Sequence, residues 1–240
     1  MLYFIHDLDD NLQKFHPHAV DAMHAAAACA VIEDCGLTLT VDEVKKLIEE
    51  SVRTKNSHFD LLIEQHGADW RTLHLGYNLR MDRGIVKPIA HLPACMAQFN
   101  GHAEHSILSH SHMAWASDCV DINGIRPWIP DERIITLEMY HTEPKHKGFK
   151  GFELALQSMG GPDPKNVIFT DDTAANHVMA KKMGMQTVWS SHGRTLAAEF
   201  ASSVDHIVDD VTVFMQNLAQ HMGLPAVKTQ GRAPSLAPDS

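Results

Sequence analysis

The sequence lacks several features that would assign a protein to a class at once. No apolar run approaches the roughly 18–20 residues that span a bilayer, and the short apolar run near residue 1 turns acidic immediately, unlike a signal peptide. The four cysteines are scattered and form no CxxC pair, which is typical of reduced thiols rather than of disulfides or zinc ligands. These absences argue against a membrane-spanning or disulfide-stapled class, and we expect a cytoplasmic protein.

Positive charge is also scarce. The 20 lysines and arginines face 30 aspartates and glutamates, which gives a formal net charge of −10. Such a surface repels nucleic acids and anionic membranes, so we expect neither as a partner. With 240 residues, 44% of them hydrophobic, the chain is long enough for one large domain or for a core with an insert. We expect a monomer or a homodimer.

Strand signals are missing between residues 15 and 100. Instead, an alanine-rich stretch at residues 19–33 has helical spacing, and residues 40–43 (Thr-Val-Asp-Glu) have the form of a capping box. A helical block of this size is too long for a simple crossover between two strands. We therefore interpret residues 15–93 as an inserted α-helical cap that lies over a pocket.

After residue 105 the chain alternates between strands and helices. Such alternation predicts an α/β fold, with a Rossmann-like parallel sheet flanked by helices on both faces. The predicted core comprises residues 1–14 and 94–225, and the Pro-, Gly- and Ser-rich composition of residues 226–240 predicts a disordered tail. The expected strands after the insert lie at residues 106–109, 133–137, 166–170, 186–189 and 206–208.

Carboxylates gather directly after two of the apolar strands. The first strand runs into Asp7, Asp9 and Asp10, and a later one runs into Asp171 and Asp172. Acids after one strand could simply cap the next helix. Four buried acids at two strand ends, namely Asp7, Asp9, Asp171 and Asp172, repel one another unless a cation lies between them. A tight turn would let Asp7 and Asp9 face one cavity, and Mg²⁺ is usually held by one or two carboxylates with phosphate oxygens and water.

A hydroxyl and a group of lysines complete the pattern. Ser109 ends a predicted strand, and Lys145, Lys147 and Lys150 precede the helix that begins near Phe152. This combination suits phosphoryl transfer, because one carboxylate can attack phosphorus while a second acid protonates the leaving oxygen and later activates water. A hydroxyl, an ammonium group and a metal ion would stabilise the phosphoryl oxygens.

Together, these motifs resemble those of the haloacid dehalogenase (HAD) superfamily of hydrolases, in its pyrimidine 5′-nucleotidase-like branch. Ile5-His6-Asp7-Leu8-Asp9-Asp10-Asn11-Leu12 is similar to the first motif, DxDx(T/V), and Ile107-Leu108-Ser109 is similar to the second. Residues 144–156 resemble the lysine motif and its helix, and residues 169–188 resemble the fourth motif with its helix–strand unit. The resemblance covers roughly residues 1–215 and rests on the order and separation of the motifs together.

The resemblance implies a HAD-like core with a specificity cap, Mg²⁺ as the cofactor, and a role for each matching position. Asp7 would be the nucleophile and a metal ligand. Asp9 would be the general acid and base, and would give its backbone carbonyl to Mg²⁺. Asp171 and Asp172 would complete the metal site. The phosphate-binding candidates are Ser109, His110 and Asn11.

Two positions depart from the family pattern. Asn11 stands where Thr or Val is usual, and we expect its side chain to hydrogen-bond the neighbouring backbone and shape the loop. In the lysine motif, counting forward from Glu138 favours Lys145, whereas counting back from the helix start falls on His146, between Lys145 and Lys147. We therefore name Lys145 first and Lys147 second as the stabilising lysine.

Other functions stay open. A phospho-receiver module also combines an acidic pocket with a lysine, but it has no Asp-x-Asp pair and no helical insert, and a dehalogenase does not need Asp9. A phosphoglycolate or sugar phosphatase, a phosphomutase and a catalytically degenerate phosphate-binding member are the remaining alternatives. A zinc site is a minor possibility beside the default of surface or pocket-rim histidines, and its ligands would come from His102, Glu104, His105, His110 and His112.

The expected substrate is a small phosphorylated metabolite, with a nucleoside monophosphate as the first choice. The choice of a nucleotide depends mainly on the resemblance, because neighbouring branches of the family act on phosphoglycolate or sugar phosphates. The cap supplies aromatic and polar side chains that could hold a compact organic group. These side chains, which could equally form the core of the cap, are Phe59, His66, Trp70, Tyr77, Asn78 and Arg80.

Overall fold

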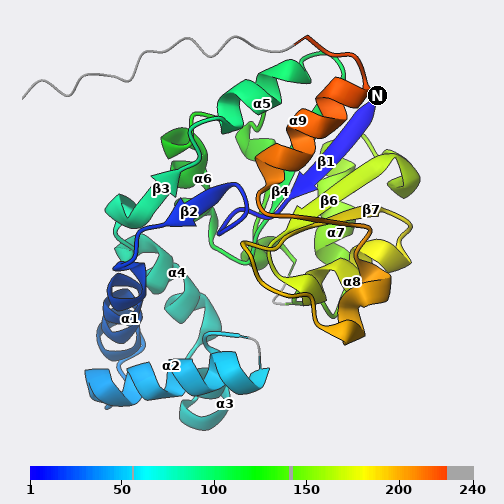
Figure 1. Ribbon diagram of the computed structural model, residues 1–240. Helices are drawn as coiled ribbons and strands as arrows, with labels where there is room; N and C mark the ends of the chain where they lie inside the picture. The colour runs from blue at the N-terminus through cyan, green and yellow to red at the C-terminus, as the bar shows by residue number, and fades with distance from the viewer. Residues whose placement is uncertain (56, 141–142, 226–240) are drawn as a thin grey trace, which may run out of the picture.

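The fold is organised around a six-stranded parallel sheet (Figure 1). The computed structural model describes residues 1–55, 57–140 and 143–225, so the tail predicted at 226–240 lies outside the described residues. The strands stand in the order β5-β4-β1-β6-β7-β8, and every neighbouring pair is parallel. Their bounds are β1 Leu2–His6, β4 Ala103–Leu108, β5 Ile134–Ile135, β6 Val167–Asp171, β7 Gln186–Ser190 and β8 His206–Val208.

Strand β1 lies in the interior of the sheet, between β4 and β6, which explains its apolar sequence. Phe4 packs into the core on one face and Ile5 into the core on the other, and both are fully buried. A strand covered on both faces needs apolar side chains pointing both ways. Because parallel strands end at the same edge, the acids after β1 and β6 emerge side by side. The backbone N–H of Asp7 donates to the carbonyl of Thr170 over 2.8 Å.

Helices cover both faces of the sheet, which confirms the predicted α/β fold. Three helices bury apolar side chains with Phe4: α5 (Leu92–Gln98), α6 (Met113–Ile122) and α9 (Val211–His221). Two helices bury theirs with Ile5 on the opposite face: α7 (Lys150–Ser158) and α8 (His177–Lys182).

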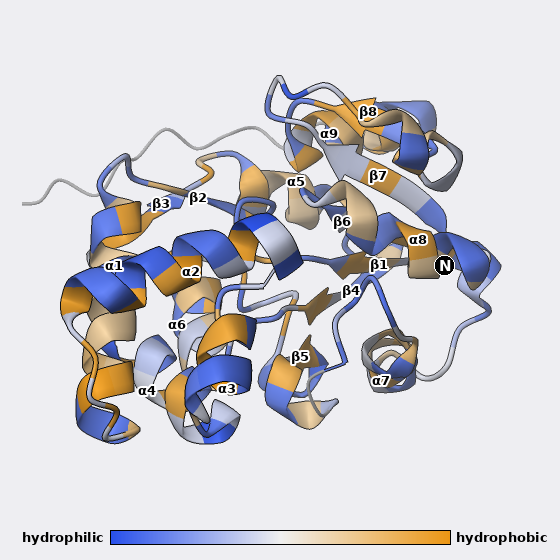
Figure 2. Ribbon diagram, turned by 90° about the horizontal axis from the view of Figure 1, so that it is seen from below, coloured by the Kyte–Doolittle hydropathy of each residue, from blue (hydrophilic) through white to orange (hydrophobic). Residues whose placement is uncertain are grey.

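Four further helices stand to one side of the sheet and share a hydrophobic cluster of their own (Figure 1). Val44, Leu62 and Leu73 are fully buried in that cluster. Figure 2 shows polar and apolar bands alternating along α2, as expected for a helix with one buried side. Its capping box is confirmed, because the N–H of Thr40 donates to Glu43 Oε2 over 2.8 Å and the N–H of Glu43 donates to Thr40 Oγ1 over 3.3 Å. The helices are α1 Ala19–Cys29, α2 Val41–Lys55, α3 Asp60–His66 and α4 Trp70–Arg80.

The insert is not free of strands, and this part of the prediction was wrong. Strands β2 (Gln13–Phe15) and β3 (Val86–Pro88) pair in antiparallel fashion at the two ends of the helical block. Each has three residues, too few to show a period of two in the sequence. The predicted boundary at residue 94 also cuts through α5, which packs against α9 of the core.

Two smaller predictions also need correction. The strand expected at residues 133–137 has only Ile134–Ile135, because the chain enters a 3₁₀ turn at Leu137–Met139. The helix expected to begin at Ala174 starts as a 3₁₀ turn and becomes α-helical at His177. Within the described part of the chain, none of the helices has the length and apolar character needed to cross a membrane.

Candidate active site

Lys145 occupies the centre of the candidate site, between two carboxylates. Its Nζ lies 2.5 Å from Asp7 Oδ1 and 2.7 Å from Asp171 Oδ2, and it also donates to the carbonyl of Leu108 over 3.2 Å. Asp7 follows β1, Asp171 ends β6, and Lys145 lies in the turn before α7. The side chain of Lys145 is only 1% exposed, so the structure brings together one buried cation and two buried acids from three separate segments.

The charges of this group do not balance. Burial raises the pKa of Asp7 well above its ordinary value, and the neighbouring acids add to this rise although Lys145 opposes it. Burial also acts against the charge of Lys145, but Asp171 and Asp7 outweigh it and raise the pKa of the lysine. The pKa of Asp172 rises to about 6 through burial and the charge of Asp171. Lys145 and the half-exposed Arg194, which pairs with Asp172, are therefore too little positive charge for the three acids.

Three carboxylates form a ready set of metal ligands. Oxygen atoms of Asp7, Asp171 and Asp172 all lie within 4.8 Å of one another. Hard oxygen donors at this spacing, together with excess negative charge, fit a divalent cation such as Mg²⁺. The side chain of Asp9 does not belong to this set, which leaves its backbone carbonyl as the predicted contact.

The Asp9 carboxylate points toward β2 and α6 rather than toward the other acids. Its Oδ1 accepts hydrogen bonds from Trp115 Nε1 over 2.9 Å and from Gln13 Nε2 over 2.7 Å, and its Oδ2 accepts from Ser111 Oγ over 2.6 Å. The same Ser111 donates its backbone N–H to Ser109 Oγ over 3.0 Å. Ser111 therefore links the predicted acid–base residue to the predicted phosphate-binding hydroxyl.

Ser109 and His110, the predicted phosphate-binding residues, lie next to the lysine segment. Ser109 follows β4, and its carbonyl accepts a hydrogen bond from Tyr140 Oη over 2.9 Å. His110 Nε2 accepts the backbone N–H of Lys145 over 3.0 Å. Burial and the nearby charge of Lys145 lower the pKa of His110 well below its ordinary value, so the ring is neutral and acts as an acceptor. His110 thus holds the lysine segment and is not placed as a phosphate-binding cation.

Asn11 has a structural position, which corrects its assignment to phosphate binding. Its Nδ2 donates to the carbonyl of Asp7 over 3.0 Å and to Thr170 Oγ1 over 2.9 Å, and its Oδ1 accepts from Ser190 Oγ over 2.8 Å. The expected hydrogen bond to the neighbouring backbone is therefore confirmed. The side chain is fully buried, and its hydrogen bonds connect the end of β1 with β6 and β7.

Lys147 does not reach the site. It is exposed on the turn that follows Pro144, whose carbonyl accepts its backbone N–H over 2.8 Å. Lys150 is exposed at the start of α7. Of the two lysines predicted from the sequence, Lys145 alone lies beside the acids.

The histidines near β4 do not converge on a metal. His105 points into the core, where its ring stacks on Phe4 and His6 at centroid distances of 5.0 and 5.4 Å. His112 caps α6 by accepting the backbone N–H of Ala114. Within residues 1–55, 57–140 and 143–225, the only group of three or more potential metal ligands is that of Asp7, Asp171 and Asp172, so a zinc site at His102, Glu104, His105, His110 and His112 is not formed.

Several cap side chains that were predicted to hold the substrate instead contact other residues of the protein. Arg80 pairs with Glu33 and Asp34, away from the acids. Asn78 is buried and accepts the backbone N–H of His112 over 3.1 Å, which docks α4 onto the loop after β4. Of the other four candidates, Phe59 and Tyr77 meet edge to face at 5.0 Å, Trp70 is half-buried and His66 is exposed. Tyr77 also packs against the core cluster of Phe4, and the charge of Asp9 adds to burial in raising the pKa of its hydroxyl.

The structure adds residues that the sequence did not single out. Asn176 Nδ2 donates to both oxygens of Asp171, over 3.1 and 3.0 Å, and the N–H of Thr173 donates to Asp171 Oδ1 over 2.7 Å. The sequence feature that could have identified Thr173 and Asn176 is the turn Asp-Asp-Thr-Ala-Ala-Asn, in which both follow the two acids closely. Gln13, Ser111 and Trp115 gave no comparable signal, because their contacts with Asp9 depend on tertiary packing.

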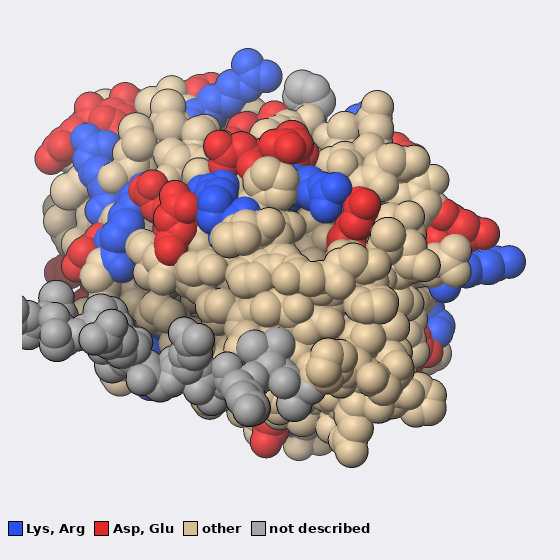
Figure 3. Space-filling view, turned by 90° about the horizontal axis from the view of Figure 1, so that it is seen from above, with Lys and Arg blue, Asp and Glu red and all other residues tan. Residues whose placement is uncertain are grey.

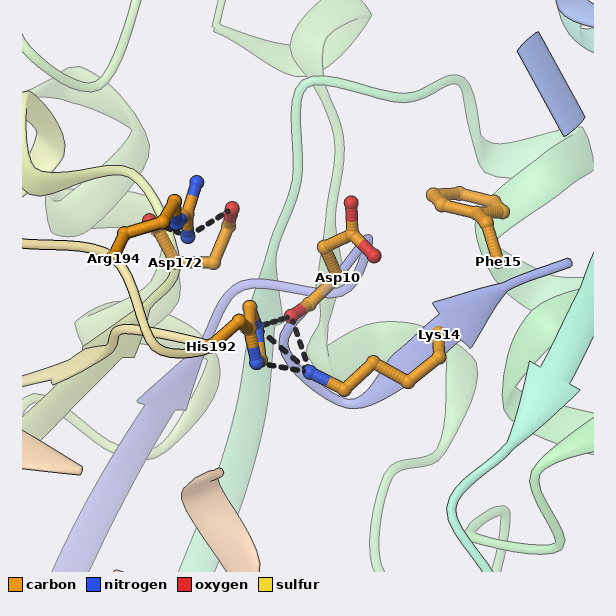
Figure 4. A pocket seen from close by; sticks show the side chains of 6 residues that line it. All are labelled: Asp10, Lys14, Phe15, Asp172, His192 and Arg194. Carbon is orange, nitrogen blue, oxygen red and sulfur yellow. Dashed lines mark hydrogen bonds and ion pairs between the residues drawn. The ribbon is translucent and has the colours of Figure 1, made fainter. Parts of the chain in front are cut away.

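A cleft of about 370 Å³ opens beside Asp172 (Figure 4). Nε2 of His192 donates to the carbonyl of Asp10 over 2.6 Å, and Lys14 Nζ lies 2.5 Å from Nδ1 of the same ring. Asp10 and His192 both have positive φ angles, 57° and 50°, which few non-glycine residues adopt. The loop after β7 is therefore fastened to the acidic loop after β1. The lining residues are Asp10, Lys14, Phe15, Asp172, His192 and Arg194.

Comparisons with known proteins agree with this architecture. No family model matches the sequence, and no curated protein matches it. A HAD phosphatase from Thermococcus onnurineus superposes with a TM-score of 0.63 at 13% identity, over 95% of this chain and 100% of that one. The magnesium-bound HAD-hydrolase YfnB from Bacillus subtilis gives 0.60 at 13% identity, over 93% and 99%. A β-phosphoglucomutase from Clostridium difficile gives 0.59 at 14% identity, over 92% and 98%.

These likenesses span nearly the whole length of each protein. At such low identity they establish the fold, which is that of HAD-like hydrolases: a Rossmann-like core with a helical insert after the first strand. The predicted fold class is therefore confirmed, and the activity has to be argued from the residues of the site.

Proposed function

We propose that this chain is a Mg²⁺-dependent phosphomonoester hydrolase that works through an aspartyl-phosphate on Asp7. The observation that carries the proposal is the position of Lys145, which bonds Asp7 and Asp171 together while Asp172 completes a set of three metal-ligand carboxylates. Such a site combines a nucleophile with two sources of positive charge, which is the chief requirement for attack on an anionic phosphoryl group.

In the first step, a carboxylate oxygen of Asp7 would attack phosphorus, and the bond from phosphorus to the leaving oxygen would break. Asp9 would supply the proton that the leaving alcohol needs. Lys145 would balance charge at the phosphoryl oxygens, and the hydroxyl of Ser109 would orient them. Mg²⁺ held by Asp7, Asp171, Asp172 and the Asp9 carbonyl would supply further charge neutralisation.

In the second step, water would attack phosphorus, and Asp9 would take its proton as the bond between phosphorus and Asp7 breaks. Inorganic phosphate would leave, and both acids would return to their starting forms. For both proton transfers Asp9 must exchange one of its present hydrogen bonds, to Ser111, Trp115 or Gln13, for a bond to the leaving group or to water.

The proposed substrate is a small phosphorylated metabolite, with a nucleoside monophosphate first, as in the pyrimidine 5′-nucleotidase-like branch. Acidic and basic side chains intermingle on the face shown in Figure 3, which offers no broad basic surface for nucleic acid or phosphoprotein. The likeness to a β-phosphoglucomutase keeps a sugar phosphate substrate and phosphomutase activity as alternatives. We also propose a cytoplasmic location, in keeping with four cysteines that are all free.

A phosphate-release screen tests the proposal. We expect Mg²⁺-dependent hydrolysis of a generic aryl phosphate, and a higher kcat/KM for UMP and CMP than for phosphoglycolate or hexose phosphates. Asp7→Asn should abolish turnover, because it keeps the shape of the side chain but removes the attacking charge, whereas Asp42→Asn on the exposed side of α2 should not. A preference for hexose phosphates or phosphoglycolate would overturn the nucleotide assignment, and unchanged turnover in Asp7→Asn would overturn the nucleophile.

A further inference from the structure

Arg194 holds one oxygen of a candidate metal ligand. Its Nη2 donates to Asp172 Oδ2 over 3.0 Å and to the backbone carbonyl of Asp172 over 2.7 Å (Figure 4). The Oδ1 atom of the same carboxylate has a single, long contact, from Thr173 Oγ1 at 3.4 Å. Asp172 therefore has one oxygen held by a charged donor and one oxygen with only a weak contact.

The guanidinium of Arg194 is fixed by its own loop. Its Nε donates to the carbonyl of Ser191 over 2.9 Å, and Nη2 also lies 3.2 Å from the carbonyl of Ser190. The group stacks over the ring of Trp189 at 5.7 Å, and Trp189 Nε1 donates to the carbonyl of Asp172 over 2.7 Å. The planar guanidinium thus has a defined orientation, which a flexible ammonium group would not reproduce.

The other two acids are restricted in a similar way. Asp7 Oδ1 accepts a hydrogen bond from Lys145, and both oxygens of Asp171 accept hydrogen bonds from Lys145, Thr173 or Asn176. A carboxylate oxygen that accepts one hydrogen bond keeps a second lone pair for a metal ion, so the hydrogen bonds fix the orientation of the carboxylates without by themselves excluding them as ligands. Arg194 differs from Lys145 in its exposure. The side chain of Arg194, which contacts Asp172, is 50% exposed, whereas that of Lys145 is buried between Asp7 and Asp171.

The orientation of the carboxylates matters because divalent cations differ in what they require. Ca²⁺ accepts carboxylates through both oxygens and takes 6–8 ligands, whereas Mg²⁺ keeps a near-ideal octahedron, bound by one or two carboxylates with waters and substrate oxygens. A carboxylate whose orientation is fixed by a rigid donor on one oxygen suits the single-oxygen contact that Mg²⁺ makes and hinders the rotation needed for a two-oxygen contact with Ca²⁺.

We propose that Arg194 is a positioning residue that restricts Asp172 to one oxygen and so makes the site select Mg²⁺ over Ca²⁺. The inference rests on the metal site of the proposed function. A purely electrostatic role of Arg194 would affect both ions alike, since both carry two charges. An effect through the orientation of the carboxylate acts mainly on Ca²⁺.

The test is a metal-competition titration without substrate. Mn²⁺ is bound to the protein, and its displacement by Mg²⁺ or Ca²⁺ is followed through the electron paramagnetic resonance signal of free Mn²⁺. For Arg194→Met we expect the ratio of the Kd for Ca²⁺ to the Kd for Mg²⁺ to fall about tenfold, the scale of one charge-assisted hydrogen bond. Arg194→Lys keeps the charge but not the planar group, so its ratio should fall as well.

Arg126→Met is the matched control. Arg126 also bonds a carboxylate, that of Asp121, and a backbone carbonyl, that of Ser117, but it touches none of the three acids. Its ratio should equal that of the wild type, with circular dichroism verifying the fold of each variant and Arg194→Gln replacing any variant that does not fold. Three outcomes would overturn the role of Arg194: equal changes in the Kd values of both ions in Arg194→Met, no change in either Kd, or a wild-type Kd ratio in Arg194→Lys. Failure of Mg²⁺ to bind the wild-type protein would overturn the metal site itself as well.

Discussion

The ring of His110 accepts the backbone N–H of Lys145 over 3.0 Å. This one hydrogen bond connects the loop after β4 with the turn before α7 and so fixes where the lysine enters the acidic site. His110 is in turn connected to the cap, because His74 Nε2 on α4 donates to the carbonyl of His110 over 2.9 Å. The position of Lys145 therefore depends on His110, whose ring bonds the backbone of the lysine segment rather than the acids.

Replacing His110 should lower turnover more than substrate binding. In His110→Ala the N–H of Lys145 loses its partner, and a buried unpaired donor costs about 1–3 kcal/mol, so the lysine segment should shift and kcat should fall about tenfold or more. Steady-state kinetics on the aryl phosphate measure the effect. His102→Ala, at an exposed histidine before β4, is the control. A rise in KM with kcat unchanged would mean that His110 contacts the substrate directly.

Asp9 should be essential for turnover but not for metal binding. Asp9→Asn removes the acid–base group, a contribution of about 10²–10⁴ in rate, yet keeps the backbone carbonyl that is the proposed metal contact. Turnover measures the loss, and Mn²⁺ binding measured as above should stay within about twofold of the wild type. Loss of metal binding together with activity would place the Asp9 side chain in the metal site. Trp115→Phe, which removes only one donor to Asp9, should have a smaller effect.

Asp172 should give the metal-free protein a pH dependence of defined sign. Its pKa is raised from 3.8 to about 6 by burial and the charge of Asp171. The folded state therefore holds this proton more tightly than the unfolded chain, so the contribution of Asp172 to the free energy of unfolding falls as pH rises from about 4 to about 6, and the loss is complete above that range. Asp172→Asn should raise the Tm of the metal-free protein at about pH 7 and raise it clearly less near pH 4.5.

The wild type has to be compared with Asp172→Asn at each pH, because the contribution of other groups to stability changes with pH in the opposite direction. Burial lowers the pKa of His6 and of His105, so their contribution to stability rises as pH rises toward neutrality. These histidines are common to wild type and variant and cancel in the difference. Mg²⁺ should raise the Tm of the wild type more than that of Asp172→Asn at neutral pH. The same Tm difference at both pH values would contradict the assigned titration.

The helical insert should move against the core. A cap over the acids would exclude water from a reactive phosphoryl group, and closing such a lid is a common gating step. Spin labels at Glu50→Cys in α2 and Lys165→Cys before β6, in a chain with Cys29 and Cys35 replaced by serine, would report the distance between them by pulsed electron paramagnetic resonance. We expect a broad distribution that narrows when Mg²⁺ and inorganic phosphate are added. One narrow distribution that ignores both additions would rule out the motion.

The acids of the site could be predicted from the sequence because their placement depends on two local signals. An apolar run that ends in carboxylates identifies the end of a strand, and parallel pairing brings such ends to one edge. Asp7, Asp171 and Asp172 meet for this reason. Lys145 was harder to choose over Lys147, because the segment between β5 and α7 has no regular period, and burial alone separates the two lysines.

Other features depend on tertiary contacts that no local pattern encodes. The direction of the Asp9 carboxylate is set by Trp115 and Gln13, which lie in different elements. Asn11 has the polarity of a ligand but is fully buried, and its partners Thr170 and Ser190 become neighbours only after the sheet has formed. Strands β2 and β3 are too short to show periodicity and are stabilised by each other across the helical insert.

The interior position of β1 also has a consequence for the order in which the chain folds. Leu2 pairs with Ala103, and Tyr3 pairs with Val167, so β1 is synthesised long before β6 and must wait for residues 167–171 before it has both neighbours. The helices between residues 19 and 80 pack against one another and bury a cluster of their own, so they can form during that wait. The acidic site can therefore be completed only when β6 joins β1 and brings Asp171 next to Asp7.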